Sequence, residues 1–119
     1  MPSDDRLTEA LNFGDVVLVP FPYTDQTASK RRPEEVISPR AYNLARPDVV
    51  LMSITSQLRP TPGLGDVGLT AWAAAGLLKP SAIKPVISTF EQGLVIRRLG
   101  TLGDDDRTAL RRSLLEIFG

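Results

Sequence analysis

The sequence predicts a mainly β, β-rich α+β fold: a small, strongly bent antiparallel sheet or barrel covered by a helix. Three observations lead to this fold class. Several short apolar runs rich in β-branched residues are bounded by turn-forming residues. Ten prolines and nine glycines favour short strands over long helices. One amphipathic helical pattern lies at the C-terminal end. At 119 residues and 42% hydrophobic content the chain fits one core, so we expect a single domain over residues 1–119.

Two strong strand patterns lie in the N-terminal half, after an extension over residues 1–12 that has room for a turn or two of helix. Residues 15–22 form a β-branched apolar run that follows a glycine and is closed by prolines, which predicts a buried strand. Residues 48–56 carry the strongest pattern. Their unbroken apolar start predicts burial on both faces and a central place in the sheet.

The segment between these two strands is harder to assign. Residues 23–32 are polar and end in three consecutive cations, which is typical of an exposed loop. Residues 33–38 are predicted as a strand, although Glu34 and Glu35 are unusual there. Successive strand residues point to opposite faces, so one carboxylate meets the core, an interface or the basic segment unless a face is solvated or the strand starts later. Residues 39–47, between two prolines, are predicted as a loop.

The C-terminal half alternates turns with short elements. Residues 60–68 are predicted as a turn region and residues 69–76 as one short helix or a strand followed by a turn. Residues 82–89 are predicted as a strand, and residues 94–99 as a turn or short strand.

The clearest helix is predicted over residues 104–118. Three aspartates stand at its N-terminal end, where the helix dipole favours negative charge. An apolar stripe at helical spacing predicts packing against the rest of the domain. The stripe consists of Leu110, Leu114, Ile117 and Phe118.

Two residue types are missing, and this narrows the chemistry. The chain has no histidine and no cysteine. This excludes a histidine acid–base pair, a thiolate nucleophile and a zinc site built from the usual soft ligands. Arginine, lysine, hydroxyl and carboxylate groups remain for any site.

Location follows from two further observations. No apolar run approaches the ~20 residues that span a bilayer. The first five residues are acidic where a signal peptide would be basic. We therefore expect a soluble, cytosolic protein.

The charge is balanced overall but not along the chain. Fourteen basic and fourteen acidic side chains cancel, so there is no global field of the kind that marks a nucleic-acid binder. Residues 1–25 carry five acidic side chains against one basic, whereas residues 26–59 carry six basic against three acidic. A basic middle segment allows a local anionic ligand. Ordinary charge scatter on a solvated surface explains the same distribution.

Two short segments suggest how an anion would be held. Lys-Arg-Arg-Pro at residues 30–33 and Ile-Thr-Ser-Gln at residues 54–57 each adjoin a strand pattern. Together they can place a guanidinium fork and a hydroxyl at neighbouring strand ends, which suits a phosphodiester. The residues by themselves leave a nuclease, an RNA-binding module and an interaction domain all open.

These segments also resemble the MazF/PemK family of toxin endoribonucleases, the mRNA interferases of bacterial type II toxin–antitoxin pairs. The matching segments occur in the family's order, so the resemblance runs from about residue 13 to the C-terminus. They are residues 14–22, 30–33, 48–57, 75–81 and 97–100.

The resemblance implies a CcdB/PemK-like fold related to SH3 barrels and a homodimer whose paired surface forms an RNA groove. Family members cut single-stranded RNA, including mRNA, at short sequences without a metal or other cofactor. The ribose 2′-oxygen attacks the adjacent phosphate and leaves a 2′,3′-cyclic phosphate and a 5′-hydroxyl. The implied partner is an antitoxin whose acidic, flexible tail occupies the same groove; no membrane is involved.

By the resemblance, the family's catalytic arginine and threonine fall on Arg32 and Thr55. A guanidinium can donate two hydrogen bonds to the charged oxygens of a phosphorane-like transition state, and a hydroxyl can donate a third. Arginine stays protonated and no histidine is available, so the general base is left unassigned. The structural alternatives are a solvated charge for Arg32 and strand propensity for Thr55.

Other residues near these two are expected to hold the RNA. The expected phosphate and backbone contacts come from cations and polar groups, and the expected base contacts from aromatic rings. These residues are Lys30, Arg31, Ser56 and Gln57, with Phe21 and Tyr23 for stacking. Core packing is the structural alternative for Phe21.

One departure from the family pattern affects the expected activity. Small or aliphatic residues usually follow Arg-Pro, and Glu34 and Glu35 stand there instead. They can pair with Arg32, repel the RNA backbone or disturb the strand. We therefore expect weakened or absent activity, through natural attenuation or deliberate alteration. The alternatives are a toxin-fold protein that binds antitoxin or RNA without cutting, and a CcdB-type gyrase poison, which has no need of the two motifs.

Overall fold

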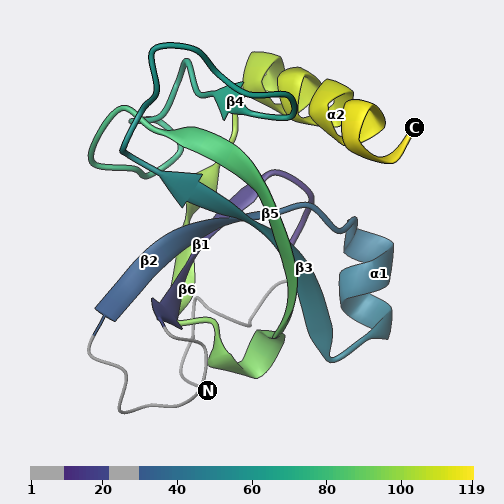
Figure 1. Ribbon diagram of the computed structural model, residues 1–119. Helices are drawn as coiled ribbons and strands as arrows, with labels where there is room; N and C mark the ends of the chain where they lie inside the picture. The colour runs from purple at the N-terminus through teal and green to yellow at the C-terminus, as the bar shows by residue number, and fades with distance from the viewer. Residues whose placement is uncertain (1–9, 22–29) are drawn as a thin grey trace.

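A curled, six-stranded antiparallel sheet with a C-terminal helix forms the structure, a computed structural model that describes residues 10–21 and 30–119 (Figure 1). The strand order is β4-β5-β3-β2-β1-β6. This confirms the predicted mainly β class and the bent antiparallel sheet. The strands are β1 (Asp15–Phe21), β2 (Lys30–Val36), β3 (Asp48–Thr55), β4 (Val67–Gly68), β5 (Ala82–Glu91) and β6 (Arg97–Thr101), and the helices are α1 (Arg40–Ala45), the one-turn 3-10 helix η1 (Gln92–Leu94) and α2 (Asp104–Phe118).

The curl of the sheet buries both of its faces. Val16 belongs to a core cluster on the α2 side, together with Met52 and Leu110. Its neighbour Val17 belongs to a second cluster on the opposite face, together with Leu51. Adjacent strand residues alternate between faces, so two buried faces require unbroken apolar runs. This explains the predicted strands at residues 15–22 and 48–56, both of which are confirmed, and β3 lies inside the sheet between β5 and β2.

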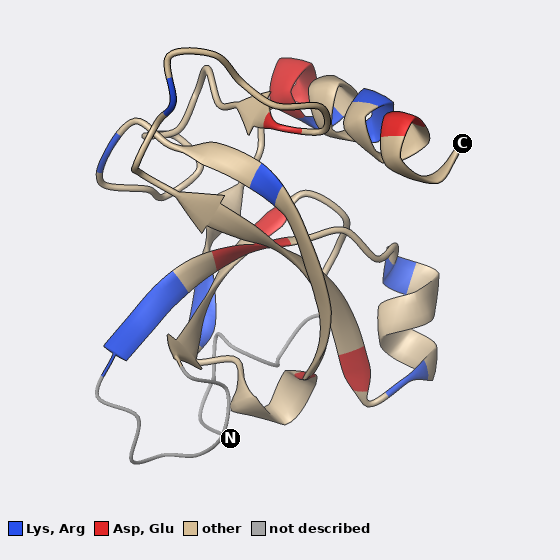
Figure 2. Ribbon diagram, in the orientation of Figure 1, with Lys and Arg blue, Asp and Glu red and all other residues tan. Residues whose placement is uncertain are grey.

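The prediction for residues 23–38 is wrong at its boundary. β2 begins at Lys30, so the three consecutive cations lie on a strand and not in a loop. Pairing with β1 decides this, because Phe21 lies opposite Lys30 and Val19 opposite Arg32. Figure 2 shows the basic start of β2 in blue, followed by its acidic stretch in red. Residues 22–29 lie outside the described residues.

The loop predicted for residues 39–47 is also wrong, because α1 occupies most of it. The buried side chain of Asn43 ties this short helix down. Its amide donates to the carbonyl oxygens of Leu11 (2.8 Å) and Ser38 (3.0 Å). Pro39 stands just before the helix, where a missing N–H removes no helical bond. A six-residue helix held by one buried side chain has no hydrophobic periodicity to predict it.

Residues 69–76 form turns, neither a helix nor a strand. The carboxylate of Asp106 accepts hydrogen bonds from the backbone N–H groups of Thr70 (3.0 Å) and Ala71 (3.0 Å), which fixes these turns against the start of α2. Gly76 then has a φ of +92°, and a Cβ there would collide with the backbone carbonyl of Leu99. The chain therefore passes directly against β6, which begins at Arg97 after η1.

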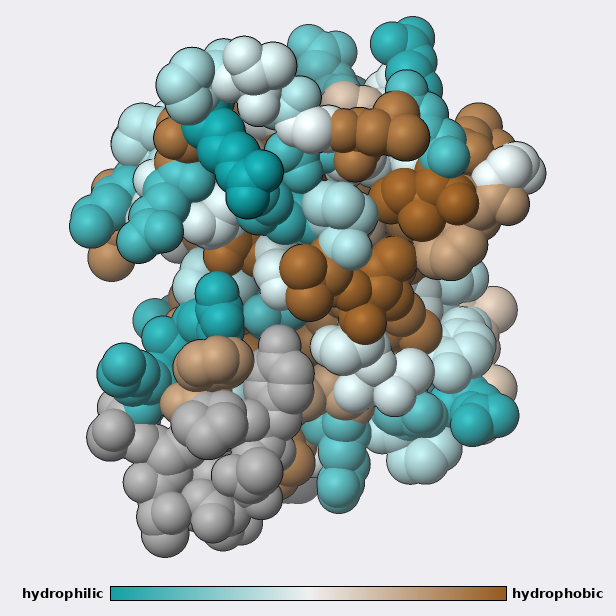
Figure 3. Space-filling view, in the orientation of Figure 1, coloured by the Kyte–Doolittle hydropathy of each residue, from teal (hydrophilic) through white to brown (hydrophobic). Residues whose placement is uncertain are grey.

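The predicted strand at residues 82–89 and the C-terminal helix are confirmed, but one member of the helical stripe is not packed. Leu110 is buried, and Leu114 and Ile117 pack against the core. Phe118 is 68% exposed, because it is the last helical residue and the helix extends past the sheet (Figure 1). Figure 3 shows apolar surface gathered over β5 and beside the C-terminal half of α2.

No helix in the described part of the chain is long and apolar enough to span a bilayer. The predicted helical turn within residues 3–12 falls mostly on residues 1–9, which lie outside the described residues.

Glu35 is a fully buried carboxyl group in the α2-side core. It lies opposite Val16 and Met52 in the β-ladder, and neither of its oxygen atoms has a hydrogen-bond partner among the described residues. Burial raises the pKa of Glu35 well above its usual 4.5, and the charges of Asp15 and Asp106 raise it further. The fold therefore favours the protonated form of this side chain.

This burial predicts a pH-dependent stability. Because the pKa of Glu35 is higher in the folded state, the folded protein retains a proton that the unfolded chain has lost, so stability falls as pH rises from 4.5 through the folded pKa. Glu35→Met, which keeps the volume, should stabilise the protein by about 1–3 kcal/mol near pH 8. Urea unfolding of both proteins across this range measures the difference. A gain that does not grow with pH would contradict the assignment.

Candidate functional site

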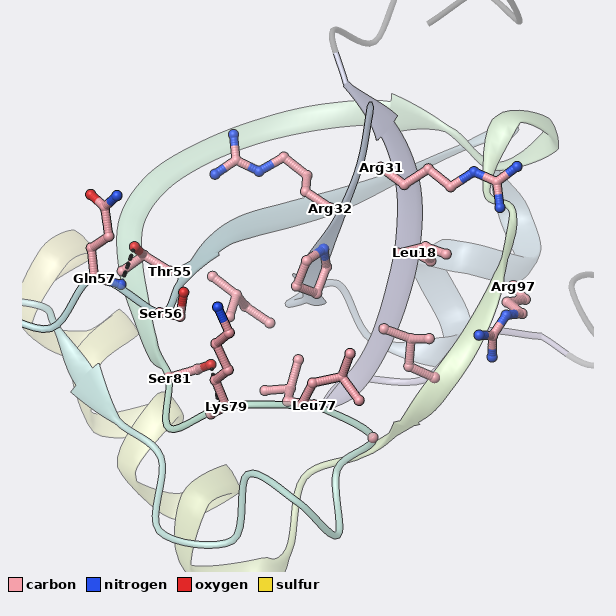
Figure 4. Close-up of a pocket in the computed structure, with 15 residues that line it drawn as sticks. Leu18, Arg31, Arg32, Thr55, Ser56, Gln57, Leu77, Lys79, Ser81 and Arg97 are labelled. Carbon is pink, nitrogen blue, oxygen red and sulfur yellow. Dashed lines mark hydrogen bonds between the residues drawn. The ribbon is translucent and has the colours of Figure 1, made fainter. Parts of the chain in front are cut away.

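A pocket of about 660 Å³ lies between the start of β2, the end of β3, the loop after Gly76 and the start of β6 (Figure 4). The antiparallel register explains why these strand ends meet. Glu34 lies opposite Ser53, and continuing this register by two residues brings Arg32 across from Thr55. The β2–β3 pairing ends at Glu34, next to Pro33, which has no N–H to donate. The space past the last pair is the pocket.

Positive charge dominates this pocket. Among the described residues, four cations and no carboxylate line the pocket, although the whole chain is neutral. The cations come from β2, the loop before β5 and the start of β6. A concave site lined by one sign of charge attracts ligands of the opposite sign. The cations are Arg31, Arg32, Lys79 and Arg97.

Hydroxyl and amide groups line the side of the pocket formed by the end of β3. The backbone N–H of Gln57 donates to the Thr55 hydroxyl oxygen (3.0 Å). Since the hydroxyl accepts this bond, its own proton is available to a ligand. Figure 4 shows the Arg32 side chain extending toward this side and the Lys79 amine pointing into the pocket. The hydroxyl of Ser81, also in the lining, donates to the carbonyl oxygen of Lys79 (2.8 Å).

Two neighbours orient the side chain of Arg32. Its guanidinium carbon lies 4.5 Å from the centre of the Phe21 ring, and its Nε lies 3.7 Å from Oε2 of Glu34. The Arg32 side chain remains 34% exposed, so part of the guanidinium faces the pocket. Phe21 is therefore neither a core residue nor part of the pocket lining; it supports Arg32 through a cation–π contact.

The two glutamates after Arg-Pro act on different parts of the molecule. Glu34 pairs with Arg32, as expected for one of them, and it is fully buried. Glu35 points to the opposite face, into the core. The strand is not disturbed, since β2 runs unbroken through both residues.

The sequence matches the family described as PemK-like, MazF-like toxin of type II toxin–antitoxin system over residues 12–118. The chain belongs to this toxin family. A search of curated protein sequences found no match.

Solved structures of similar fold agree with this assignment. An endoribonuclease from Mycobacterial species aligns with a TM-score of 0.68 and 18% identity, over 91% of this chain and 90% of the other. An endoribonuclease in complex with its cognate antitoxin, also from Mycobacterial species, aligns with a TM-score of 0.71 and 19% identity, over 88% and 91%. A MazE–MazF structure from Deinococcus radiodurans aligns with a TM-score of 0.71 and 20% identity, over 93% and 97%. The toxin therefore has the MazF-like fold, as its sequence predicts.

The pocket of the toxin brings together most of the residues predicted from its sequence. Both predicted catalytic residues line it. Lys30, at the start of β2, and Phe21 are not among the lining residues, and Tyr23 lies outside the described residues. The predicted residues that line the pocket are Arg31, Arg32, Thr55, Ser56 and Gln57.

Three polar or charged lining residues were not assigned to the site from the sequence: Lys79, Ser81 and Arg97. Their segments, residues 75–81 and 97–100, do match the family in sequence. A matching segment does not say which of its side chains faces a cavity. That depends on the turn at Gly76 and on the register of β6 against β1.

Proposed function

We propose that this toxin is a metal-independent, sequence-specific endoribonuclease that cuts single-stranded RNA, including mRNA. The main support for the proposal is the position of Arg32 and Thr55, from two different strands, in one cationic pocket that no carboxylate of the described residues lines. A polyanion that carries a reactive hydroxyl beside each phosphate suits such a site. The described relatives of similar fold include endoribonucleases, which supports the same reading.

The reaction uses groups that the pocket supplies. The ribose 2′-oxygen attacks the phosphorus, the bond to the 5′-oxygen breaks, and the products are a 2′,3′-cyclic phosphate and a 5′-hydroxyl. Arg32 on β2 donates hydrogen bonds to the phosphate oxygens as their negative charge grows, and the hydroxyl of Thr55 on the neighbouring strand β3 donates a further one. Lys79 contributes a further positive charge in the same pocket. The acceptor of the 2′-hydroxyl proton is unassigned, since the described part of the lining contains no carboxylate and the chain contains no histidine.

RNA cleavage in EDTA tests this proposal directly. The purified toxin should cut a long single-stranded RNA at discrete positions, and mapping should find 2′,3′-cyclic phosphate ends. Arg32→Ala and Thr55→Ala should each lower the single-turnover rate by about 10²–10³-fold, as expected for loss of one transition-state donor. Arg112→Ala is the matched control, because Arg112 is exposed on α2 and does not line the pocket. Cleavage that requires a divalent metal, or RNA left intact both by the toxin and by its Glu34→Ala, Glu35→Val double variant, would refute the proposal.

Attenuation by the two glutamates is the second part of the proposal. The double variant Glu34→Ala with Glu35→Val should cut RNA faster than the unmodified toxin. The structure separates the two contributions: Glu34 contacts Arg32 and offsets its charge, whereas Glu35 contacts the core. Most of the gain should therefore appear in Glu34→Ala alone, and Glu35→Val alone serves as the control. Single-turnover rates measure both, and an unchanged rate in the double variant contradicts attenuation.

A catalytically silent toxin-fold protein is the second candidate function. The pairing of Glu34 with Arg32 favours it, because a neutralised guanidinium still binds but stabilises the transition state less. The cleavage experiment separates the two candidates. A CcdB-type gyrase poison is less well supported, since such a protein has no need for Arg32 and Thr55 in one pocket.

We further propose a homodimer that acts in the bacterial cytoplasm with a cognate antitoxin whose acidic tail enters the cationic pocket. Light scattering should give twice the 13.0 kDa chain mass.

Exposed apolar surface supports self-association, since contiguous patches of this kind mark protein contacts. Val86 on β5 is 61% exposed, and Leu115 and Phe118 on α2 are each 68% exposed. Leu115→Ser with Phe118→Ser should lower the mass toward the monomer if this face is the contact, and Leu44→Ser on α1 is the control. A monomeric toxin at micromolar concentration would contradict the dimer.

A further inference from the structure

The basic side chains of the pocket fall into two groups. Arg32 and Lys79 both lie on the side of the pocket formed by the end of β3, where the Lys79 amine is near Ser56, whereas Arg31 extends in the opposite direction toward Arg97 (Figure 4). One phosphate at the Arg32–Thr55 side accounts for the first group only. The second group has no role in the reaction proposed above.

The β-sheet register explains why Arg31 and Arg97 face the same space. Leu18 on β1 lies opposite Pro33 on β2 and opposite Arg97 on β6. Arg31 is two residues before Pro33 and therefore on the same face. Arg31 and Arg97 thus rise from the two strands that flank β1, about 9.6 Å apart across the strands and offset by two residues, or about 7 Å, along them. Two long arginine side chains can converge on one anion across this gap.

The neighbouring arginine shows that this placement is specific. Arg98 points to the other face of β6, where its Nε donates to a carboxylate oxygen of Asp15 at 3.0 Å. Arg98 is a structural residue that ties β6 to the start of β1. Arg97 is exposed and lines the pocket, where no described residue contributes a carboxylate. Because successive side chains of β6 point to opposite faces, Arg98 has a structural role and Arg97 is left to contact a ligand.

Apolar side chains separate the two groups of cations. Leu18, Leu77 and Leu99 line the pocket between the Thr55 side and the Arg97 side, as Figure 4 shows for the first two. An uncharged, flat group suits this floor, and a nucleobase presents such a face. The pocket therefore suits a polymer in which phosphates alternate with bases: each group of cations can hold a phosphate, and the apolar floor between them can hold a base.

We propose that Arg31 and Arg97 form a second phosphate subsite, which holds a phosphate next to the scissile one while the apolar floor receives the nucleoside between them. This inference rests on the proposed RNA substrate. It gives Arg97 a role in binding RNA, and it specifies that Arg31 contacts the same phosphate as Arg97. The subsite binds substrate and transition state alike, so it acts on KM and not on kcat.

Short oligoribonucleotides of increasing phosphate number test the subsite. Di-, tri- and tetranucleotides taken from around the mapped cut, with a 2′-deoxy sugar at the scissile position, contain one to three phosphates and cannot be cleaved. Oligouridylates of the same lengths serve if no cut is found. Unmodified toxin should gain affinity when a second phosphate is added. Arg97→Ala should lose this gain and bind the dinucleotide as before.

The salt dependence of binding supplies a second readout. Loss of one phosphate contact should reduce the slope of log K against log salt by about 0.7 for a single strand. Arg31→Ala should behave in the same way, and the double variant should lose little more than either single variant, because both side chains hold one phosphate. Arg112→Ala is the charge-matched control outside the pocket, and Arg97→Lys, with thermal melting of each variant, distinguishes lost contact from lost fold.

Each result decides the inference. An Arg97→Ala effect that is equal for one and for several phosphates, or absent for all, overturns the second subsite. Cleavage that depends on Arg32 but not on Arg97 leaves the proposed endoribonuclease intact and removes the subsite. Uncut RNA with a length-dependent Arg97 effect retains the subsite on a protein that binds RNA without cutting it.

Discussion

The pairing of β2 between β1 and β3 is the constraint on which the rest of the structure depends. It sets Glu34 opposite Ser53 and thereby brings Arg32 toward Thr55 where the strands part. It also aligns Arg31 with Pro20 and Pro33 with Leu18, next to Arg97 on β6. Because side chains alternate along a strand, a one-residue slip would send every one of these groups to the other face. Core packing on both faces of the sheet resists such a slip, since apolar residues fill both sides.

Two adjacent glutamates on this strand, Glu34 and Glu35, point to opposite faces of the sheet and lie in different surroundings. Glu34 lies on the same face of the sheet as Arg32, and its carboxylate forms an ion pair with the Arg32 guanidinium. Glu35 faces the other core and is a buried acid whose pKa is raised by its surroundings. Neighbours in sequence thus affect different properties, one the charge of the site and the other the stability of the fold. A family-level comparison of sequence would treat them as one substitution, whereas the alternation of the strand separates them.

The neutral charge of the chain conceals a polarised molecule. The carboxylates of the described residues lie outside the pocket lining, several of them in ion pairs, at a helix start or in the core, as Asp15 with Arg98 and Asp106 with Thr70 show. The cations that remain around the pocket are left to attract an anion. Local arrangement and not net charge therefore decides whether such a small protein can hold a polyanion. The apolar floor between the cations adds a preference for a polymer with bases over a simple inorganic anion.

The sequence by itself determined the mainly β class, the strands that begin at Asp15, Asp48 and Ala82, and the C-terminal helix, because these follow from local periodicity and from turn residues. It also indicated Arg32 and Thr55 through two motifs and a family resemblance. It missed α1, which one buried side chain, Asn43, holds in place, and it placed the start of β2 too late. Only the tertiary structure decided which cations face the pocket, why Phe118 stays exposed and which glutamate touches Arg32. These outcomes depend on register and on the reach of neighbouring elements, and both are long-range pairings that no local pattern encodes.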